Sequence, residues 1–256
     1  MNNKYFNSLK INSNISFGFF TRNGGYSKGN FNSLNCSKSS GDTKVKIIKN
    51  IKKAQNQLKL NSKFLKTVHQ FHSNKVIVIN KSNMYKNFKA DGLITQERSI
   101  SIAVLTADCC PIFLFDKDAS FISCLHAGWR GAYKNIINGS LKKILKIQQD
   151  KKKINVVIGP CINKKNFEVE NVFKNKFIKK DTNYKKFFSN SSNKDKSLFD
   201  IRALIKYQLL ENGIKNIKNI DLDTYSNKNL FFSHRRSTHQ NRLPTGRMIN
   251  IIGFNS

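Results

Sequence analysis

The pattern of apolar and polar positions divides the chain into short strands and a few amphipathic helices. Near the middle, three apolar runs rich in β-branched and aromatic residues follow one another at 99–106, 111–116 and 119–126. Runs of this length that are separated by turn residues predict strands. By the same criteria we expect further strands at 15–21, 64–72, 75–79, 90–95, 154–158, 229–233 and 247–253. Apolar residues at helical spacing predict helices at 43–58, 133–147 and 200–211.

The order of these elements indicates the fold class. Strands outnumber helices and partly come in consecutive runs, which favours a mixed α/β (α+β) fold, a mixed sheet with flanking helices, over a regular βαβ winding. Neither a composition break nor an internal repeat divides the 256 residues, so we expect a single compact domain over 1–256. Within it, the Lys-, Asn- and Ser-rich stretch 174–196 is expected to be a mobile insertion.

The sequence lacks the usual signals for export or membrane insertion. No run approaches the roughly 18 apolar residues of a membrane span. The start, MNNKYFNSLKINSN, has neither the apolar core nor the cleavage site of a signal peptide. Five cysteines are an odd number, which argues against a disulfide framework and for reduced thiols. We therefore expect a cytoplasmic protein with no membrane partner.

The net charge of +31 raises the question of a nucleic-acid partner. Only eight of the 46 basic residues are arginines, and the lysines are spread along the chain beside abundant Asn and Ile. This composition is typical of an AT-rich genome, and no RNP1 motif, zinc-finger spacing or KH-type loop is present. We interpret most of the charge as a solvated surface and expect no specific nucleic-acid partner; a functional polyanion-binding surface is the alternative.

Three residues of metal-binding type are expected to lie close together. His72, Cys109 and His126 each end an apolar strand in the predicted pattern, and adjacent strands place such ends side by side. Three His or Cys ligands with an open fourth position are the pattern of catalytic zinc sites. The spacing of 37 and then 17 residues matches no local zinc motif, so a buried cysteine with unrelated surface histidines is the alternative.

Motifs of higher specificity run through essentially the whole chain. In order they are GFFTRNGGYSKGNFNSLN (18–35), QFHSNKV (70–76), ADGLIT (90–95), TADCCPIFLFD (106–116), HAGWRG (126–131), IGPCI with FEV shortly after it (158–169), and SHRR with TGRMINIIG (233–253). In sequence and order they resemble the bacterial YfiH family, whose members are named laccase-domain or multicopper polyphenol oxidase proteins and purine nucleoside phosphorylases. The combination of HAGWRG, ADC and SHRR is the specific part of the resemblance.

The resemblance implies a compact α/β fold with zinc on His72, Cys109 and His126. It also implies phosphorolysis of adenosine, inosine and methylthioadenosine, alongside adenosine deamination. Copper-dependent phenol oxidation and the editing of a UDP-linked muropeptide, a peptidoglycan precursor, are attributed to other family members. Five histidines cannot build the type 1 and trinuclear sites of a multicopper oxidase, so laccase chemistry is disfavoured, with Cu²⁺ kept as the alternative metal. The muropeptide hydrolase stays open, because it could use the same zinc site.

The two nucleoside reactions need different catalytic groups. For deamination, a metal held by Cys109 and its partners would activate water toward C6 of adenine, and Asp108 is the candidate acid; a structural carboxylate is the alternative. For phosphorolysis, phosphate attacks C1′ of the ribose and needs a cationic pocket. Arg22, Arg130 and Arg235 are the candidates for binding phosphate, Arg130 first because the two glycines of HAGWRG let the backbone close around a ligand.

Three departures from the family pattern bear on the site. Ser73 stands where glycine is usual, and Cys110 replaces a typical leucine. The segment between SHRR and TGR is longer than in many members, which leaves the placement of Arg247 open. We expect purine nucleosides and phosphate as small-molecule partners, and a monomer or small homo-oligomer.

Overall fold

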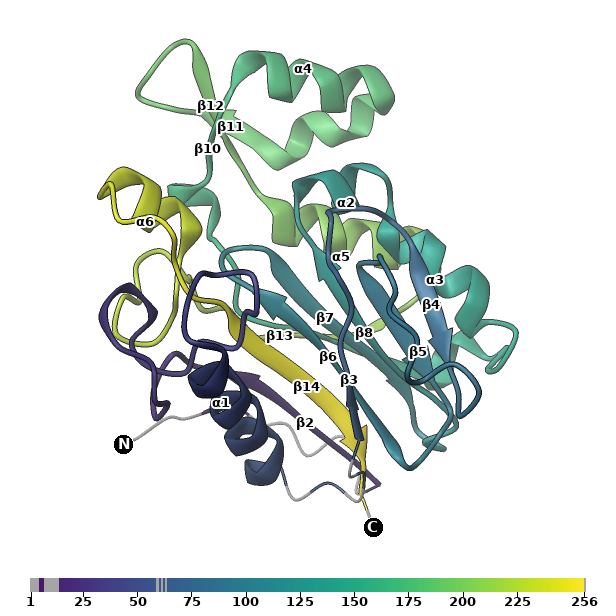
Figure 1. Ribbon diagram of the computed structural model, residues 1–256. Coiled ribbons are helices and arrows are strands. Elements are labelled where there is room, and N and C mark those ends of the chain that lie inside the picture. Colours follow the sequence, from purple (N-terminus) through teal and green to yellow (C-terminus); the bar gives the residue numbers. More distant parts are fainter. Residues whose placement is uncertain (1–4, 7–13, 59, 61, 63, 256) are drawn as a thin grey trace.

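Two larger sheets form the centre of the molecule (Figure 1). The structure, a computed structural model, describes residues 5–6, 14–58, 60, 62 and 64–255, so most of the N-terminal stretch that bears on export lies outside it. The first sheet runs β1 (Tyr5–Phe6), β2 (Ile15–Phe20), β14 (Met248–Phe254), β6 (Ile100–Thr106) and β3 (Phe64–Lys66). The second runs β13 (Asn216–Asn219), β9 (Ile154–Ile158), β7 (Cys110–Asp116), β8 (Ile122–Ala127), β5 (Gly92–Thr95) and β4 (Val76–Ile79).

The two sheets pack face to face through a core rich in phenylalanine. Phe17 and Phe19 of β2 contact Phe113 and Phe115 of β7, and the rings of Phe19 and Phe113 stack with their centroids 4.4 Å apart. Every residue of β7 and β8 is buried. Because a strand that is covered on both faces has a nearly continuous apolar sequence, these central strands were visible as unbroken apolar runs.

Helices cover the outer faces of both sheets. Helix α1 (Lys44–Gln57) packs on the first sheet, and α2 (Trp129–Tyr133), α3 (Ile136–Ile144) and α5 (Ile201–Glu211) pack on the second (Figure 1). The prediction of a single helix over 133–147 is wrong, because α2 and α3 are two separate helices. Asn135 adopts a left-handed φ of 57° and its side chain accepts a hydrogen bond from the backbone N–H of Asn138, so it separates α2 from α3 and caps the second helix.

A third, small sheet projects from this body at the top of Figure 1. It contains β10 (Glu168–Glu170), β12 (Lys196–Phe199) and β11 (Phe188–Asn190), and is accompanied by α4 (Asn171–Lys180) and the 3-10 helix η4 (Thr182–Phe187). The expectation of a mobile insertion at 174–196 is therefore wrong. The segment is stabilised by an aromatic cluster despite its polar composition, with ring contacts among Phe173, Phe177, Phe188 and Phe199.

Two expected strands also differ from the structure. The strand expected at 64–72 stops at Lys66, and His69 joins only an isolated bridge with Lys89. The segment 229–233 is not a strand, because Phe231 and Phe232 are buried in a separate cluster with Met248 before α6 (His234–His239) begins. The remaining short helices are η1 (Gly29–Phe31), η2 (Lys151–Lys153) and η3 (Lys164–Asn166). The mixed α/β class is confirmed.

No helix in the described part of the chain has both the length and the apolar character needed to cross a membrane.

We predict that Phe199→Ala strongly destabilises the small sheet. The Phe199 ring is fully buried and contacts Phe167, Phe173, Phe177 and Phe188, so its removal should cost about 3–5 kcal/mol. Urea denaturation followed by circular dichroism would measure this change.

Val172→Ala on α4 is the matched control, because the Val172 side chain is 80% exposed. The control should change the free energy of unfolding by no more than about 0.5 kcal/mol. Equal effects of the two substitutions would show that the aromatic cluster does not stabilise this part of the fold.

Candidate active site

Three side chains of metal-binding type meet beside strands β7 and β8. These strands pair antiparallel with Cys110 opposite Ala127, so Cys109, which directly precedes β7, lies beside the end of β8 and its residue His126. His72 reaches the same point from the loop between β3 and β4. The metal-binding atoms of His72, Cys109 and His126 all lie within 4.8 Å of one another. Sγ of Cys109 is 3.8 Å from Nε2 of His72.

The structural reason for this proximity differs from the predicted one. Only His126 lies near the end of a strand, as expected; it is the second-last residue of β8. His72 lies in a loop with a left-handed φ of 60°, and Cys109 follows the end of β6 by three residues. Since β6 belongs to the other sheet, adjacent strand ends do not bring the three together. The register of β7 on β8 and the fold of the His72 loop do so.

Gly128 provides the space in which the three side chains meet. A Cβ atom at this position would lie 2.6 Å from Cδ2 of His72 and 3.0 Å from Sγ of Cys109. Gly128 also precedes α2, and its carbonyl accepts the first hydrogen bond of that helix, from Ala132. The first glycine of HAGWRG is therefore required by the metal-binding side chains themselves.

The buried carboxylate of Asp91 orients two of the three residues. Its Oδ1 accepts hydrogen bonds from Nδ1 of His126 (2.8 Å) and from the backbone N–H of His72 (3.0 Å). Its Oδ2 accepts from the backbone N–H (2.6 Å) and the hydroxyl (2.7 Å) of Ser73. With Nδ1 of His126 turned toward Asp91, its Nε2 faces Cys109, the orientation found in carboxylate–histidine–metal arrangements.

The ionisation of these groups suits a metal site. Burial acts to raise the pKa of Asp91, but hydrogen bonds from His126 and Ser73 outweigh it and hold the pKa at about 2. Burial likewise opposes ionisation of Cys109, yet the neighbouring His126 and His72 lower the pKa of its thiol to about 6. Burial acts to lower the pKa of His126, but the neighbouring Cys109 and Asp91 outweigh it and raise this pKa to about 9. The metal-free site therefore holds a thiolate and a protonated His126 at neutral pH. The thiolate is the form in which cysteine binds metals, and His126 would release its proton when a metal binds.

The distance between two of the ligand atoms is close to the distance expected around a bound zinc ion. Zinc bonds of about 2.3 Å to sulfur and 2.0–2.1 Å to nitrogen in a tetrahedron place these donors about 3.6 Å apart. The distance of 3.8 Å between Cys109 and His72 is close to that value. The Cys109–His72 pair thus fits a shared metal ion, and the ligand atom of His126 lies within 4.8 Å of both.

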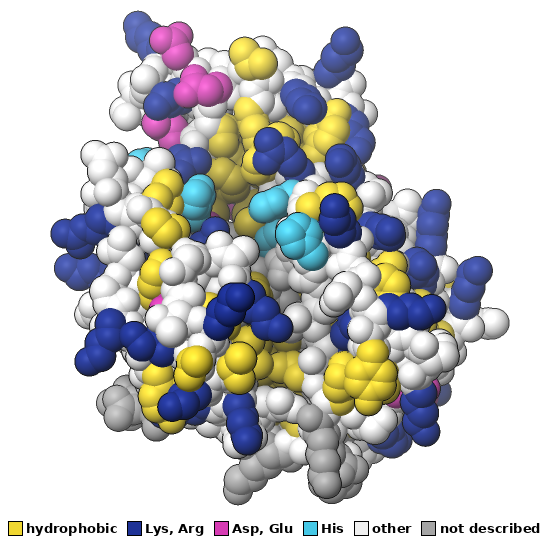
Figure 2. Space-filling model, viewed as in Figure 1, with side chains coloured by type: hydrophobic (Ala, Val, Ile, Leu, Met, Phe, Trp, Pro, Cys, Tyr) yellow, Lys and Arg dark blue, Asp and Glu magenta, His cyan; other side chains and the backbone are white. Residues whose placement is uncertain are grey.

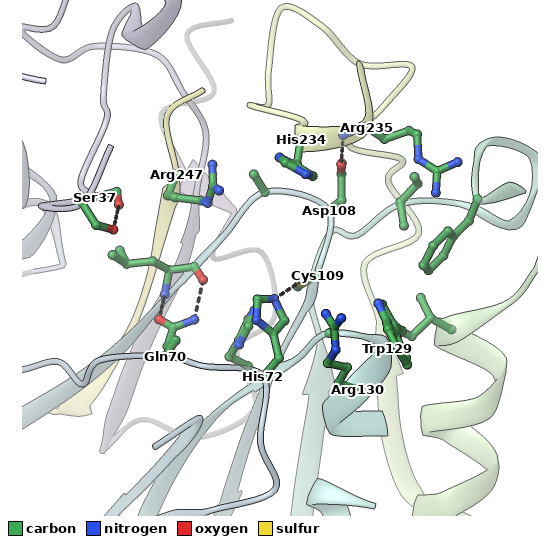
Figure 3. A pocket seen from close by; sticks show the side chains of 18 of the residues that line it. Ser37, Gln70, His72, Asp108, Cys109, Trp129, Arg130, His234, Arg235 and Arg247 are labelled. Atoms are coloured by element: carbon green, nitrogen blue, oxygen red, sulfur yellow. Dashed lines mark hydrogen bonds between the residues drawn. The ribbon is translucent and has the colours of Figure 1, made fainter. Parts of the chain in front are cut away.

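The triad opens into a cavity of about 1020 Å³ (Figures 2 and 3). Figure 2 shows histidine side chains gathered around the hollow below the small sheet. One end is aromatic, with Trp129, Phe167 and Phe173 in its lining and with the guanidinium groups of Arg130 and Arg235 over two of these rings. The other end is polar and cationic, and its lining includes Ser37, Lys38, Ser39, His234 and Arg247. The cavity therefore has two ends of different chemistry, with the triad between them (Figure 3).

Two of the three predicted phosphate-binding arginines line this cavity. Arg130 is exposed, points into the cavity, and has its guanidinium 4.4 Å from the centre of the Trp129 ring (Figure 3). Arg235 donates from Nη1 to the carbonyl of Glu168 (2.7 Å), which connects α6 to the small sheet.

The structure does not bring Arg22 to the cavity. Its Nε donates to the carbonyl of Asn32 (2.6 Å) and its Nη1 to that of Lys228 (3.3 Å), while the guanidinium lies over the ring of Phe232. Arg22 is absent from the cavity lining and instead connects two loops. This corrects the expectation that it binds phosphate there.

Asp108 has the contacts of a structural carboxylate. Oδ1 accepts from the hydroxyl of Thr224 (2.7 Å), and Oδ2 accepts from the hydroxyl of Ser233 (3.0 Å) and the backbone N–H of Arg235 (2.7 Å). Asp108 thus connects the turn before Cys109 to the start of α6. This geometry favours the structural alternative over a role as proton donor.

Sequence reasoning did not select three residues that belong to the site. Asp91 had a signal, since it is the only acid in the apolar ADGLIT segment. Arg247 and His234 lie in motifs that were singled out, but their placement depends on the loops between SHRR and TGR. No local pattern shows which cavity those loops line.

Fold and site together define a mixed α/β protein whose cavity contains a His-Cys-His cluster that could hold a metal ion. The chain belongs to the family described as multi-copper polyphenol oxidoreductase laccase, whose sequence profile matches residues 16–255. It is 37% identical over 195 residues to purine nucleoside phosphorylase RP494 of Rickettsia prowazekii, covering 76% of this chain and 77% of that protein. It is 27% identical over 254 residues to purine nucleoside phosphorylase YlmD of Bacillus subtilis, covering 95% and 90%.

Crystal structures of related proteins have the same fold. Protein NMB0706 of Neisseria meningitidis superposes with a TM-score of 0.87 at 26% identity, covering 99% of this chain and 100% of that one. The hypothetical protein YfiH of Bacillus licheniformis superposes with a TM-score of 0.85 at 28% identity, covering 93% and 92%. The predicted resemblance to the YfiH family is confirmed.

We predict that Cys109→Ala removes most of the bound metal while the fold is kept. The wild-type protein loaded with zinc should carry about one ion per chain, because three ligands define one site. Metal content would be measured by mass spectrometry of the purified, dialysed proteins.

Cys124→Ala is the matched control, because Cys124 is a buried thiol on β8 that contacts the carbonyl of Asn250 rather than the triad. The control should retain its metal. Full zinc occupancy in Cys109→Ala would contradict the assignment of Cys109 as a ligand.

We predict that Asp91→Asn weakens metal binding about 10–100-fold, the effect typical of losing a carboxylate that orients a ligand. Competition against a chelator of known affinity would measure this. Asp116→Asn is the control: Asp116 is also fully buried, but it lies at the opposite end of β7 from Cys109 and accepts hydrogen bonds from Ser120 and Gln148. If both variants bind metal equally well, Asp91 does not position the ligands.

Proposed function

We propose that the protein is a zinc-dependent purine nucleoside phosphorylase that acts on adenosine, inosine and methylthioadenosine, with adenosine deamination as a second activity. The observation that carries the proposal is the convergence of His72, Cys109 and His126 in a cavity that also contains guanidinium groups and aromatic rings. The names of the Rickettsia and Bacillus relatives support phosphorolysis. A cytoplasmic location and the absence of a specific nucleic-acid partner are part of the proposal.

Zinc is the proposed metal because two histidines and one cysteine match its preferred donors. When bound, it would supply Lewis-acid chemistry at its open coordination position. Among the residues that the structure describes, no second cluster of three or more His, Cys, Asp or Glu donors is found. A multicopper oxidase needs several such clusters. The donors present therefore support one zinc, with a single Cu²⁺ as the alternative.

The other residues have roles in binding and positioning. Trp129 and Phe173, whose ring centroids are 5.0 Å apart, offer an aromatic surface for a purine. The arginines of the cavity, with Arg130 as the candidate from sequence, would hold phosphate by bidentate hydrogen bonds. Asp108 would act as a positioning residue through its hydrogen bonds to α6.

Product analysis tests the proposal. Zinc-loaded protein would be incubated with adenosine, inosine or a UDP-muropeptide, with and without phosphate, and the products identified by chromatography and mass spectrometry. We expect free base and ribose 1-phosphate only when phosphate is present, and inosine from adenosine in either case. Cys109→Ala should lose both activities.

Two outcomes would contradict the proposal. Cleavage of the muropeptide without any release of base from nucleosides would identify the hydrolase alternative. Base release that is independent of phosphate would indicate a nucleoside hydrolase instead of a phosphorylase.

A further inference from the structure

The two ends of the cavity restrict how a nucleoside and phosphate can lie in it. In phosphorolysis a phosphate oxygen forms a bond to C1′ while the bond from C1′ to the purine nitrogen breaks. The electron pair leaves with the purine, which takes up a proton from water. The nucleophile approaches the face of the sugar opposite the leaving group. The base and the phosphate therefore occupy opposite sides of the ribose.

The aromatic end has the properties of a base-binding site. Trp129 and Phe173 meet edge to face, and Phe167 lies under the guanidinium of Arg235 at 5.5 Å. Aromatic side chains of this kind can bind a purine by stacking against the flat face of the base. If the base lies here and the ribose lies over the triad, phosphate belongs at the polar end.

Arg247 provides the guanidinium at that polar end. Its Nη1 donates to the carbonyls of Thr245 (3.0 Å) and Gly246 (3.1 Å), which fixes the guanidinium at the cavity wall. Among the described residues no carboxylate forms an ion pair with it. The negative groups that act on it are Asp108, whose oxygens are already engaged, and Cys109 of the triad.

A buried asparagine joins Arg247 to a second set of donors. Oδ1 of Asn35 accepts from the backbone N–H of Arg247 (3.0 Å) and from that of Ser37 (3.1 Å). The loop that begins at Ser37 brings Ser37, Lys38 and Ser39 to the cavity lining. The hydroxyls of Ser37 and Ser39 lie 3.2 Å apart. Arg247 and this loop are thus held in a fixed relation.

His234 adds a further donor from α6. It lines the cavity and points toward Arg247 in Figure 3, and burial and the nearby Arg247 lower the pKa of its imidazole. The cavity lining has three acidic residues. Asp108 already accepts hydrogen bonds from the start of α6, and Glu168 and Glu170 belong to β10 of the small sheet. The polar end therefore presents donors and positive charge without a competing carboxylate.

We propose that Arg247, together with His234 and the loop of Ser37 to Ser39, forms the phosphate-binding subsite, and that the wall of Trp129, Phe167 and Phe173 binds the purine base. This inference rests on the proposed function. In this arrangement Arg247 binds the phosphate, in place of Arg130, which was the candidate from sequence. Arg130, which lies over Trp129, then belongs to the base side.

The test compares Arg247→Lys with Arg130→Lys, which make the same chemical change at the two ends. Binding of inorganic phosphate to the zinc-loaded proteins would be measured by calorimetry. Binding of adenosine would be followed through the fluorescence of Trp129, the only tryptophan in the chain. The KM values for phosphate and for nucleoside would be measured separately. Zinc content and thermal unfolding would establish that each variant is folded and loaded.

We expect Arg247→Lys to weaken phosphate binding about 10–100-fold, because a lysine cannot form the two charge-assisted hydrogen bonds of a guanidinium. Its adenosine titration should be unchanged. Arg130→Lys should show the reverse, with altered adenosine binding and unchanged phosphate binding. If Arg247→Lys does not fold, His234→Gln at the exposed start of α6 should also weaken phosphate binding selectively.

Unchanged phosphate affinity in Arg247→Lys together with a loss in Arg130→Lys would overturn the proposal. Failure of the proposed function looks different, because phosphate binding is measured without turnover. If no nucleoside is cleaved but phosphate binding still depends on Arg247, the subsite stands and the phosphorylase assignment falls.

Discussion

The site depends on the buried carboxylate of Asp91. A charge without partners in the interior would cost several kcal/mol, but Asp91 accepts four hydrogen bonds of 3.0 Å or less from two separate segments of the chain. One segment carries His72 and the other carries His126. The same contacts that make the buried charge tolerable therefore fix two metal ligands before any metal binds. The left-handed backbone of His72 is held by these hydrogen bonds to adjacent N–H groups.

This interaction also accounts for one departure from the family pattern near the triad, and core packing accounts for a second. Glycine is usual at position 73 in the family pattern, and a glycine could donate only its backbone N–H to Asp91. Ser73 adds its hydroxyl to the same oxygen and is itself buried. Cys110, which replaces a typical leucine, is fully buried in the core below the second sheet, so that a small apolar thiol fills part of the space of a larger side chain.

The sequence reveals those features that depend on local pattern. Strands covered on both faces, such as β7, have unbroken apolar sequences and were predicted close to their observed bounds. The small sheet was missed because its phenylalanines are separated by lysines and asparagines, and only the fold shows that they meet. The ligand types and family motifs predicted that His72, Cys109 and His126 lie together, as they do, whereas Arg22 donates to the carbonyls of Asn32 and Lys228 outside the cavity. The placement of Arg247 stayed open in the sequence because it depends on a distant loop held through Asn35.

The small sheet is what gives the cavity its second end. Phe167 and Phe173 come from this part of the chain, and Phe173 packs against Trp129 of the main body. The contact from Arg235 to the carbonyl of Glu168 connects β10 to α6, which in turn is bound by Asp108 beside the triad. The aromatic end is therefore fixed relative to the metal ligands through a continuous set of hydrogen bonds. The small sheet and the segment before it thus provide Phe167 and Phe173 of the aromatic end, while loops and helix α6 of the main body provide the polar end.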